Sequence, residues 1–141
     1  RALEALAAMI DEVGSPVYDK YRGDERMTRG VIVRHLLLPG HVDDSMRVVR
    51  MLHERFGDAL RLSLMNQYTP VLATAAQRGD ARAARVLRAC PELAGRVDPD
   101  DYERLLDFAD AIGVEDYYWQ EGGACEESFI PAFSCEPQDA D

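Results

Sequence analysis

One arginine stands inside an otherwise apolar run, residues 31–38, which Pro39 and Gly40 close. The guanidinium of Arg34 is always charged, and its forked N–H donors suit a carboxylate or a phosphate better than a hydrophobic layer. Arginine is also rarely buried without a partner. Arg34 therefore has two interpretations, a salt bridge to an internal acid or contact with an anionic ligand.

Two histidines lie close to this arginine. His35 follows Arg34 directly, and alternation along a strand places its side chain on the opposite face. There we expect a packed or hydrogen-bonded histidine rather than a metal ligand. His41 lies in the loop after the run, without an Asp, Glu or Cys at metal-site spacing.

A compact polar group, Asn66, Gln67 and Tyr68, follows a second apolar segment. It either closes a loop or orients a ligand or substrate. Gln120 and Glu121 are candidates to line the same site.

The cysteines exclude one kind of site. Cys90, Cys125 and Cys135 are an odd number at wide spacing, with no CxxC or CxxxCxxC pattern. This chain by itself cannot supply the thiolates of an iron–sulfur cluster. We expect free thiols, as in a cytosolic protein.

Helical and strand patterns alternate along the chain. Apolar residues at helical spacing predict helices over 2–13, 42–56 and 98–112. Apolar runs predict strands over 31–38, 60–65 and 114–120, the first two covered on both faces.

The connecting segments have their own signals. We expect a polar connection over 19–29, a helical insertion over 71–97 with a short helix near 80–89, and an irregular tail over 124–141. Asp43 or Asp44 is a candidate cap for the second helix, and Asp98 before Pro99 for the last.

This order predicts an α/β fold with parallel strands joined by helices. Two or three strands make a poor independent sheet, so we interpret residues 1–141 as a single incomplete domain of a larger sheet or barrel. Ligands of such folds lie at the carboxyl ends of the strands.

Composition excludes several functions. The chain has 141 residues, 47% of them hydrophobic, and a net charge of −10 from 26 acidic and 16 basic residues. This balance argues against nucleic-acid binding, which needs clustered Lys and Arg. No apolar run has the length of a membrane span, and we expect no secretory signal. A cytoplasmic protein with neither membrane nor nucleic-acid partners is expected.

Taken together, several segments resemble a known family. RHLLLPGHVDDS and SLMNQYTP, then PELAGRVDPDDYERLLDFADAIGV, WQEG and ESFIPAF, resemble in this order the C-terminal half of radical S-adenosylmethionine (SAM) enzymes. The group most similar is that of proteins like pyruvate formate-lyase activating enzyme. The resemblance covers roughly residues 2–133, except for an apparent insertion over 71–90.

The resemblance implies a partial (β/α)6 barrel that binds SAM and a [4Fe-4S] cluster, whose ligands lie outside this chain. Together these cofactors generate a 5′-deoxyadenosyl radical, which abstracts hydrogen from a glycyl-radical partner protein or a small molecule. Arg34 matches an arginine that reaches toward the SAM carboxylate, and the backbone of Leu36 is expected beside the adenine. Tyr68 falls where those enzymes more often have a ribose-contacting His, with Gln67 next to it.

We therefore expect part of a radical SAM enzyme, inactive as this fragment alone. Two alternatives stay open. One is a non-catalytic α/β binding or interaction module derived from that family. The other is a different barrel enzyme that uses Arg34 on a carboxylate substrate.

Overall fold

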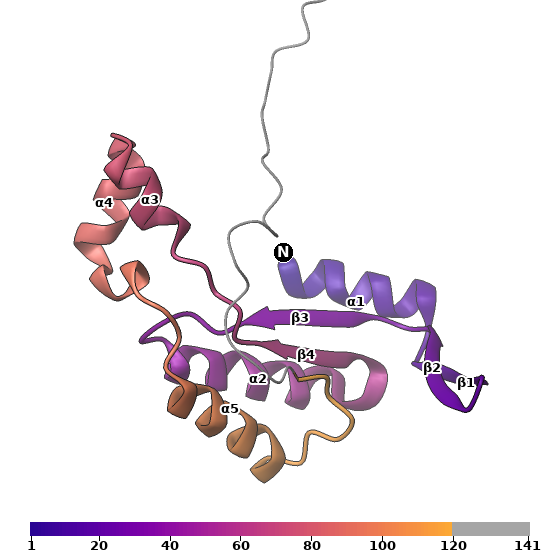
Figure 1. The fold of residues 1–141 in the computed structure, drawn as a ribbon. Coiled ribbons are helices and arrows are strands. Elements are labelled where there is room, and N and C mark those ends of the chain that lie inside the picture. The colour runs from indigo at the N-terminus through magenta and orange to yellow at the C-terminus, as the bar shows by residue number, and fades with distance from the viewer. Residues whose placement is uncertain (120–141) are drawn as a thin grey trace, which may run out of the picture.

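A computed structural model describes residues 1–119 of the chain (Figure 1). Its helices are α1 (Ala2–Val13), α2 (Val42–Phe56), α3 (Val71–Gln77), α4 (Ala81–Ala89) and α5 (Pro99–Ala111). Its strands are β1 (Val17–Tyr21), β2 (Asp24–Arg29), β3 (Ile32–Leu36) and β4 (Arg61–Met65). Two short 3-10 turns are η1 (Gly57–Ala59) and η2 (Pro91–Ala94).

The parallel pair β3–β4 organises this part of the chain. Its register runs from Ile32 opposite Arg61 to Leu36 opposite Met65, and α2 makes the connection between the strands. A parallel pair needs such a crossover because the chain must return to the end at which it started. The predicted order of strand, helix and parallel strand is confirmed.

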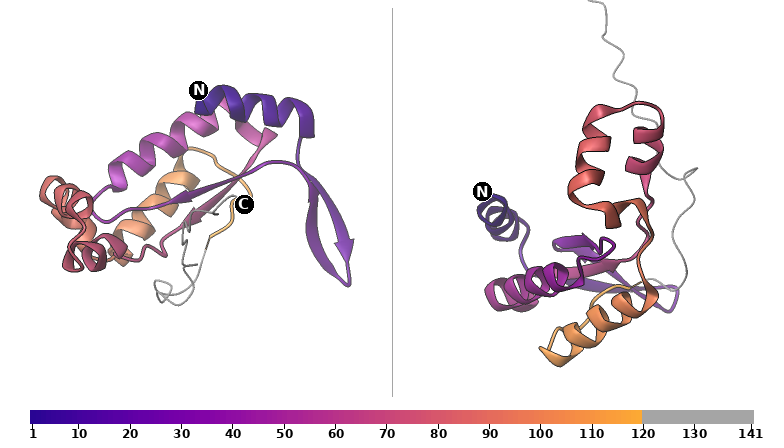
Figure 2. Two further views of the ribbon diagram at one scale, coloured as in Figure 1. Left: turned by 90° about the horizontal axis from the view of Figure 1, so that it is seen from above. Right: turned by 90° about the vertical axis from the view of Figure 1, so that its left-hand side faces the viewer.

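One face of this pair carries the hydrophobic core. Leu62 and Leu64 are 3% and 0% exposed and belong to one cluster with buried residues of α2 and α5. The hydroxyl of Tyr102 on α5 donates a 2.8 Å hydrogen bond to the carbonyl of Leu64. Figure 2 shows α1 and α2 on the same side of the strands, and apolar residues of α1 pack against the core cluster.

The other face of β3 is open, so the prediction that 31–38 is covered on both faces is wrong. Ile32 and Leu36 are 46% and 36% exposed, and Arg34 between them is exposed too. The helices that cover the core lie on the opposite side, and within residues 1–119 little covers this one. Apolar composition indicates a strand, whereas the neighbours decide how many of its faces are buried.

A β-hairpin replaces the polar connection predicted over 19–29. Strands β1 and β2 pair antiparallel from Val17 opposite Arg29 to Tyr21 opposite Asp24. Both turn residues, Arg22 and Gly23, have positive φ, as a tight hairpin turn requires. Most of the hairpin is exposed on both faces, so no apolar alternation marked it in the sequence.

The segment over 71–97, predicted to be a helical insertion, contains α3, α4 and η2. The predicted helix near 80–89 is confirmed as α4, whose cap is Asp80; its carboxylate accepts from the backbone N–H groups of Arg82 and Ala83 at 2.8 and 3.0 Å. Helix α3 was not predicted, because its Ala-rich sequence lacks an apolar face. Helices α3 and α4 stand beyond the carboxyl ends of β3 and β4 (Figure 1).

Two further expectations need correction. The N-cap of α2 is His41, without a side-chain cap hydrogen bond, and Asp43 and Asp44 lie in its first turn. In place of a third strand over 114–120, the described residues give a single parallel bridge between Ser63 and Tyr118. Glu121 and the predicted tail over 124–141 lie outside the described residues, as does Gln120.

The α/β class is confirmed in this coarse form: helices combined with two two-stranded sheets, one of them parallel. Residues 1–119 do not close a barrel. None of the helices between residues 1 and 119 has both the length and the apolar character needed to cross a membrane.

The cap of α5 gives a test of this fold. The Asp98 carboxylate accepts from the backbone N–H of Asp100 at 2.9 Å, as predicted. Replacement of Asp98 by Ala should lower the free energy of unfolding by about 1 kcal/mol, because one N–H at the helix start loses its acceptor. Urea denaturation measures this loss. Asp107→Ala, an exposed position of the same helix, should change stability by less than about 0.5 kcal/mol; equal effects of the two variants would contradict the cap.

Candidate functional site

A cleft of about 530 Å³ lies at the carboxyl end of β3, between the start of α2 and the segment after α4. Its lining is mostly apolar and includes His35, Leu36, Leu38, His41, Cys90 and Leu93. The carboxyl end of a parallel strand is where α/β folds bind ligands. We therefore take this end of the β3–β4 pair as the candidate functional site.

His35 lies on the core side of β3, opposite Arg34, and faces α2. Its Nε2 is 2.8 Å from the Oγ of Ser45, which is itself only 3% exposed. Burial lowers the pKa of His35, because a charged imidazolium loses hydration there. The expectation of a hydrogen-bonded histidine is confirmed.

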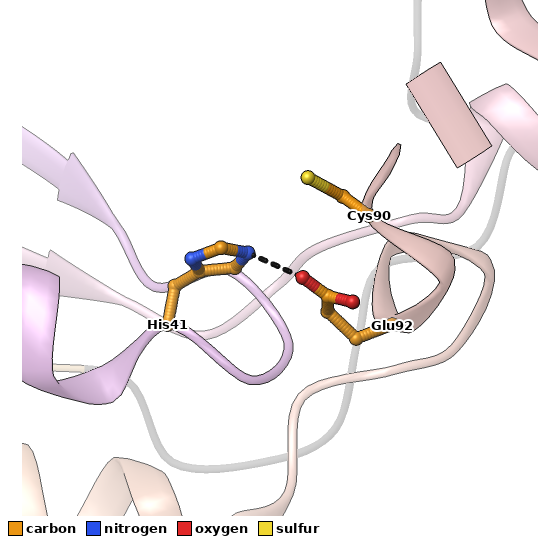
Figure 3. A group of neighbouring side chains, drawn as sticks. All are labelled: His41, Cys90 and Glu92. Atoms are coloured by element: carbon orange, nitrogen blue, oxygen red, sulfur yellow. Dashed lines mark hydrogen bonds and ion pairs between the residues drawn. The ribbon is translucent and has the colours of Figure 1, made fainter. Parts of the chain in front are cut away.

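His41, Cys90 and Glu92 come together beside this cleft (Figure 3). His41 Nε2 and Glu92 Oε1 are 2.8 Å apart, and one ligand atom from each of the three side chains lies within 4.8 Å of the others. The sequence has no Asp, Glu or Cys at metal-site spacing from His41, and the fold supplies Cys90 and Glu92 from a distant segment instead. About fifty residues separate His41 from the other two in the chain, so no local spacing could have signalled the group.

One contact joins the segment of Glu92 to the loop after β3, and a second joins it to the loop after β4. Gly40 adopts a positive φ of 74°, and a Cβ at this position would lie 3.0 Å from Glu92 Cγ. The Tyr68 hydroxyl donates to the carbonyl of Leu93 at 2.8 Å. The loops after β3 and β4 thus both contact η2, which places segment 71–97 at the carboxyl end of the sheet.

Tyr68 is 8% exposed, and burial raises its pKa. Its hydroxyl group donates a hydrogen bond to the carbonyl of Leu93, so Tyr68 fixes the position of η2. Gln67 is half-buried beside it. Next in this loop, Asn66 buries its Oδ1 without a hydrogen-bond donor from the described residues. Buried polar atoms usually have a partner, which makes this oxygen the unsatisfied acceptor of the strand end.

Arg34 and Leu36 share the open face of β3. Within residues 1–119 the Arg34 guanidinium has neither an ion pair nor a hydrogen bond, and its side chain is exposed. The acid partner that a structural role predicts is thus not found in this part of the chain. Leu36 also lines the cleft. Arg34 and Leu36 thus lie on β3, and Gln67 and Tyr68 lie in the loop that follows the neighbouring strand β4.

A second polar cluster lies at the other end of β4. Arg61 donates from Nε to the Tyr18 hydroxyl at 2.7 Å, and its guanidinium lies 3.9 Å from Asp116. Tyr18, Asp116 and three more residues line a hollow of about 300 Å³. These contacts connect the β1–β2 hairpin to the amino end of β4. We assign this cluster a structural role.

No family model matches the chain, and neither a curated protein nor a solved structure matches it significantly.

The buried His35 predicts a pH dependence of stability. Its pKa in the folded protein is lowered below the ordinary value of 6.5, so the unfolded chain takes up the proton first as the pH falls. Stability is complete above about pH 6.5 and decreases below it. Urea unfolding between about pH 7.5 and pH 5.5 should show this decrease. His35→Gln should reduce the loss of unfolding free energy between these two pH values, whereas His53→Gln, at the far end of α2, should leave that loss unchanged. A His35→Gln variant with the same pH dependence as the parent would refute this assignment.

Proposed function

We propose that this chain is the C-terminal part of a radical SAM enzyme and forms one wall of its SAM pocket. The observation that carries the proposal is Arg34: an exposed cation on the uncovered face of a parallel strand, without an acid partner in residues 1–119. A partial barrel places its cofactor against the strand face opposite the helices. Arg34 lies on that face, since its neighbour His35 contacts α2 on the other.

The chemistry of SAM fits the groups at this end of the sheet. Its carboxylate suits the guanidinium of Arg34, because two N–H donors can meet two oxygens. Its flat adenine would lie beside the backbone of Leu36, whose apolar side chain is partly exposed on the same open face. Its ribose hydroxyls and its ammonium group are hydrogen-bond donors. The buried Oδ1 of Asn66 is an acceptor without a donor among the described residues. Each part of the cofactor thus has a counterpart with the complementary property.

Gln67 and Tyr68 belong to the same proposal. Tyr68 donates its hydroxyl proton to Leu93, but a phenolic oxygen also accepts. A ribose hydroxyl that donates to this oxygen would leave the Leu93 contact intact. Tyr68 would then position η2 and contact SAM at the same time, which explains why a Tyr can stand where the related enzymes more often have a His.

The iron–sulfur cluster does not fit the described residues. They contain one free cysteine, Cys90, whereas a cluster of this kind needs three or four thiolates. Its ligands must come from another part of the protein. When bound, the reduced cluster and SAM supply a 5′-deoxyadenosyl radical that removes hydrogen from a substrate. Residues 1–119 contribute only to the binding and orientation of SAM, and the substrate is either a glycyl-radical partner protein or a small molecule.

The absence of cluster thiolates in this region also favours a second candidate, a non-catalytic α/β binding module. Such a module would keep the residues proposed to bind SAM, here called the SAM wall (Arg34, Leu36, Asn66, Gln67 and Tyr68), without the radical chemistry. The two differ in one product. Anaerobic reconstitution of the complete protein with iron and sulfide should give 5′-deoxyadenosine from SAM if it is an enzyme. SAM binding without this product would support the module.

Replacement of Arg34 by Ala tests the SAM wall itself. It should weaken SAM binding about 10- to 100-fold, because a charge-assisted hydrogen bond to the carboxylate is lost. Isothermal titration of the complete protein with SAM measures this change. Arg85→Ala is the matched control, since Arg85 is exposed on α4 and away from the open face; it should leave the affinity unchanged. Equal SAM affinity of Arg34→Ala and the parent would overturn the assignment.

A further inference from the structure

We propose that His41, Cys90 and Glu92 form a zinc site at the mouth of the cleft, with three protein ligands and one open position. The proposal does not depend on SAM binding, because none of these residues belongs to the SAM wall. It assigns a function to the insertion over 71–97, which supplies two of the three ligands.

The donor set favours zinc over calcium and magnesium. Imidazole nitrogen, thiolate sulfur and carboxylate oxygen are the three ligand types of zinc sites. Calcium and magnesium require oxygen ligands, so a site with a thiolate and an imidazole disfavours both. The three residues come from two separate segments, the loop after β3 and the segment after α4, and the side chains of Cys90 and Glu92 approach His41 from the same side of the ring (Figure 3). A metal ion would cross-link these segments.

The separation of the donor atoms is near that of a coordinated ion. All three lie within 4.8 Å of one another, and tetrahedral zinc would bring them to about 3.3–3.6 Å. All three side chains are partly exposed, which leaves room for the side-chain rotation that this closure requires. The 2.8 Å contact between His41 Nε2 and Glu92 Oε1 would open slightly as the ion replaces the shared proton.

Asp44 stands near the second nitrogen of His41, where zinc-binding histidines usually have an outer hydrogen bond. The carboxylate of Asp44 lies 3.9 Å from His41 Nδ1, the nitrogen that does not face Glu92. A carboxylate at the second nitrogen fixes the tautomer of the ring and makes the first a better ligand. Asp44 is itself held by an ion pair with Arg47. The histidine would therefore bind through Nε2 and donate from Nδ1 toward Asp44.

The open position follows from the number of ligands. Zinc sites with a purely structural role are closed by four protein ligands, whereas sites with three keep a place for water or a substrate atom. His41 and Cys90 both line the apolar cleft of about 530 Å³. A water on the ion would be adjacent to that cleft, where an apolar small molecule with one metal-binding oxygen or sulfur atom has room.

Zinc content of the complete protein tests the site. Protein prepared in zinc-containing medium and dialysed should hold one more zinc per chain than Cys90→Ala or His41→Ala, as determined by elemental analysis with iron measured separately. Glu92→Gln should lower zinc affinity by about tenfold or more, because one anionic ligand is lost. The matched controls His53→Ala and Glu54→Gln, on the distal half of α2, should keep the full zinc content.

Cobalt provides a second readout that a folding defect does not imitate. Co²⁺ in place of zinc should give a thiolate-to-cobalt charge-transfer absorption, and Cys90→Ala should remove the contribution of one thiolate from it. The circular dichroism spectrum of Cys90→Ala should equal that of the parent, which shows that the variant is folded. Equal zinc content and equal cobalt absorption in the parent, Cys90→Ala and His41→Ala would overturn the site. This outcome is independent of SAM affinity, so failure of the zinc site and failure of the SAM wall are distinguishable.

Discussion

The parallel pairing of β3 with β4 is the constraint from which the arrangement of both sites follows. Because the strands run in the same direction, α2 must connect them and their carboxyl ends must meet at one edge. That edge receives the loop of His41 and the loop of Asn66 to Tyr68. The core under the opposite face, centred on Leu64, Val49 and Leu105, fixes which side chains of β3 point away from the helices.

The sequence predicted the elements whose apolar residues follow a single period. Helices α1, α2 and α5 each have one apolar face, and the Asp98-Pro99 start of α5 forms the expected cap. The β1–β2 hairpin has no such period, because solvent lies on both of its sides. Ile32 and Leu36 led to the wrong prediction that both faces of β3 are buried. Their side chains are apolar but exposed, and composition does not show whether a second layer covers a strand.

The candidate sites divide in the same way. The hydrogen bond of His35 was predictable, since strand alternation alone directed its ring into the helix side. The approach of Cys90 and Glu92 to His41 was not, because it depends on how α3, α4 and η2 fold back on the loop after β3. That fold rests on the fit of Gly40 against Glu92 and the bond from Tyr68 to Leu93, neither of which has a local sequence signal.

The two strands of the parallel pair differ in what their outer edges meet. β4 is hydrogen-bonded on both sides, to β3 and to Tyr118, whose backbone N–H and carbonyl contact Leu62 and Leu64 at 2.8 Å. Strand β3 has a partner along one side only within residues 1–119. Its outer row of backbone groups is therefore accessible to water or to another strand. Amide hydrogens on that side of β3 should exchange with solvent while those of β4 stay protected, so the strand that carries Arg34 is also the one able to accept a further strand.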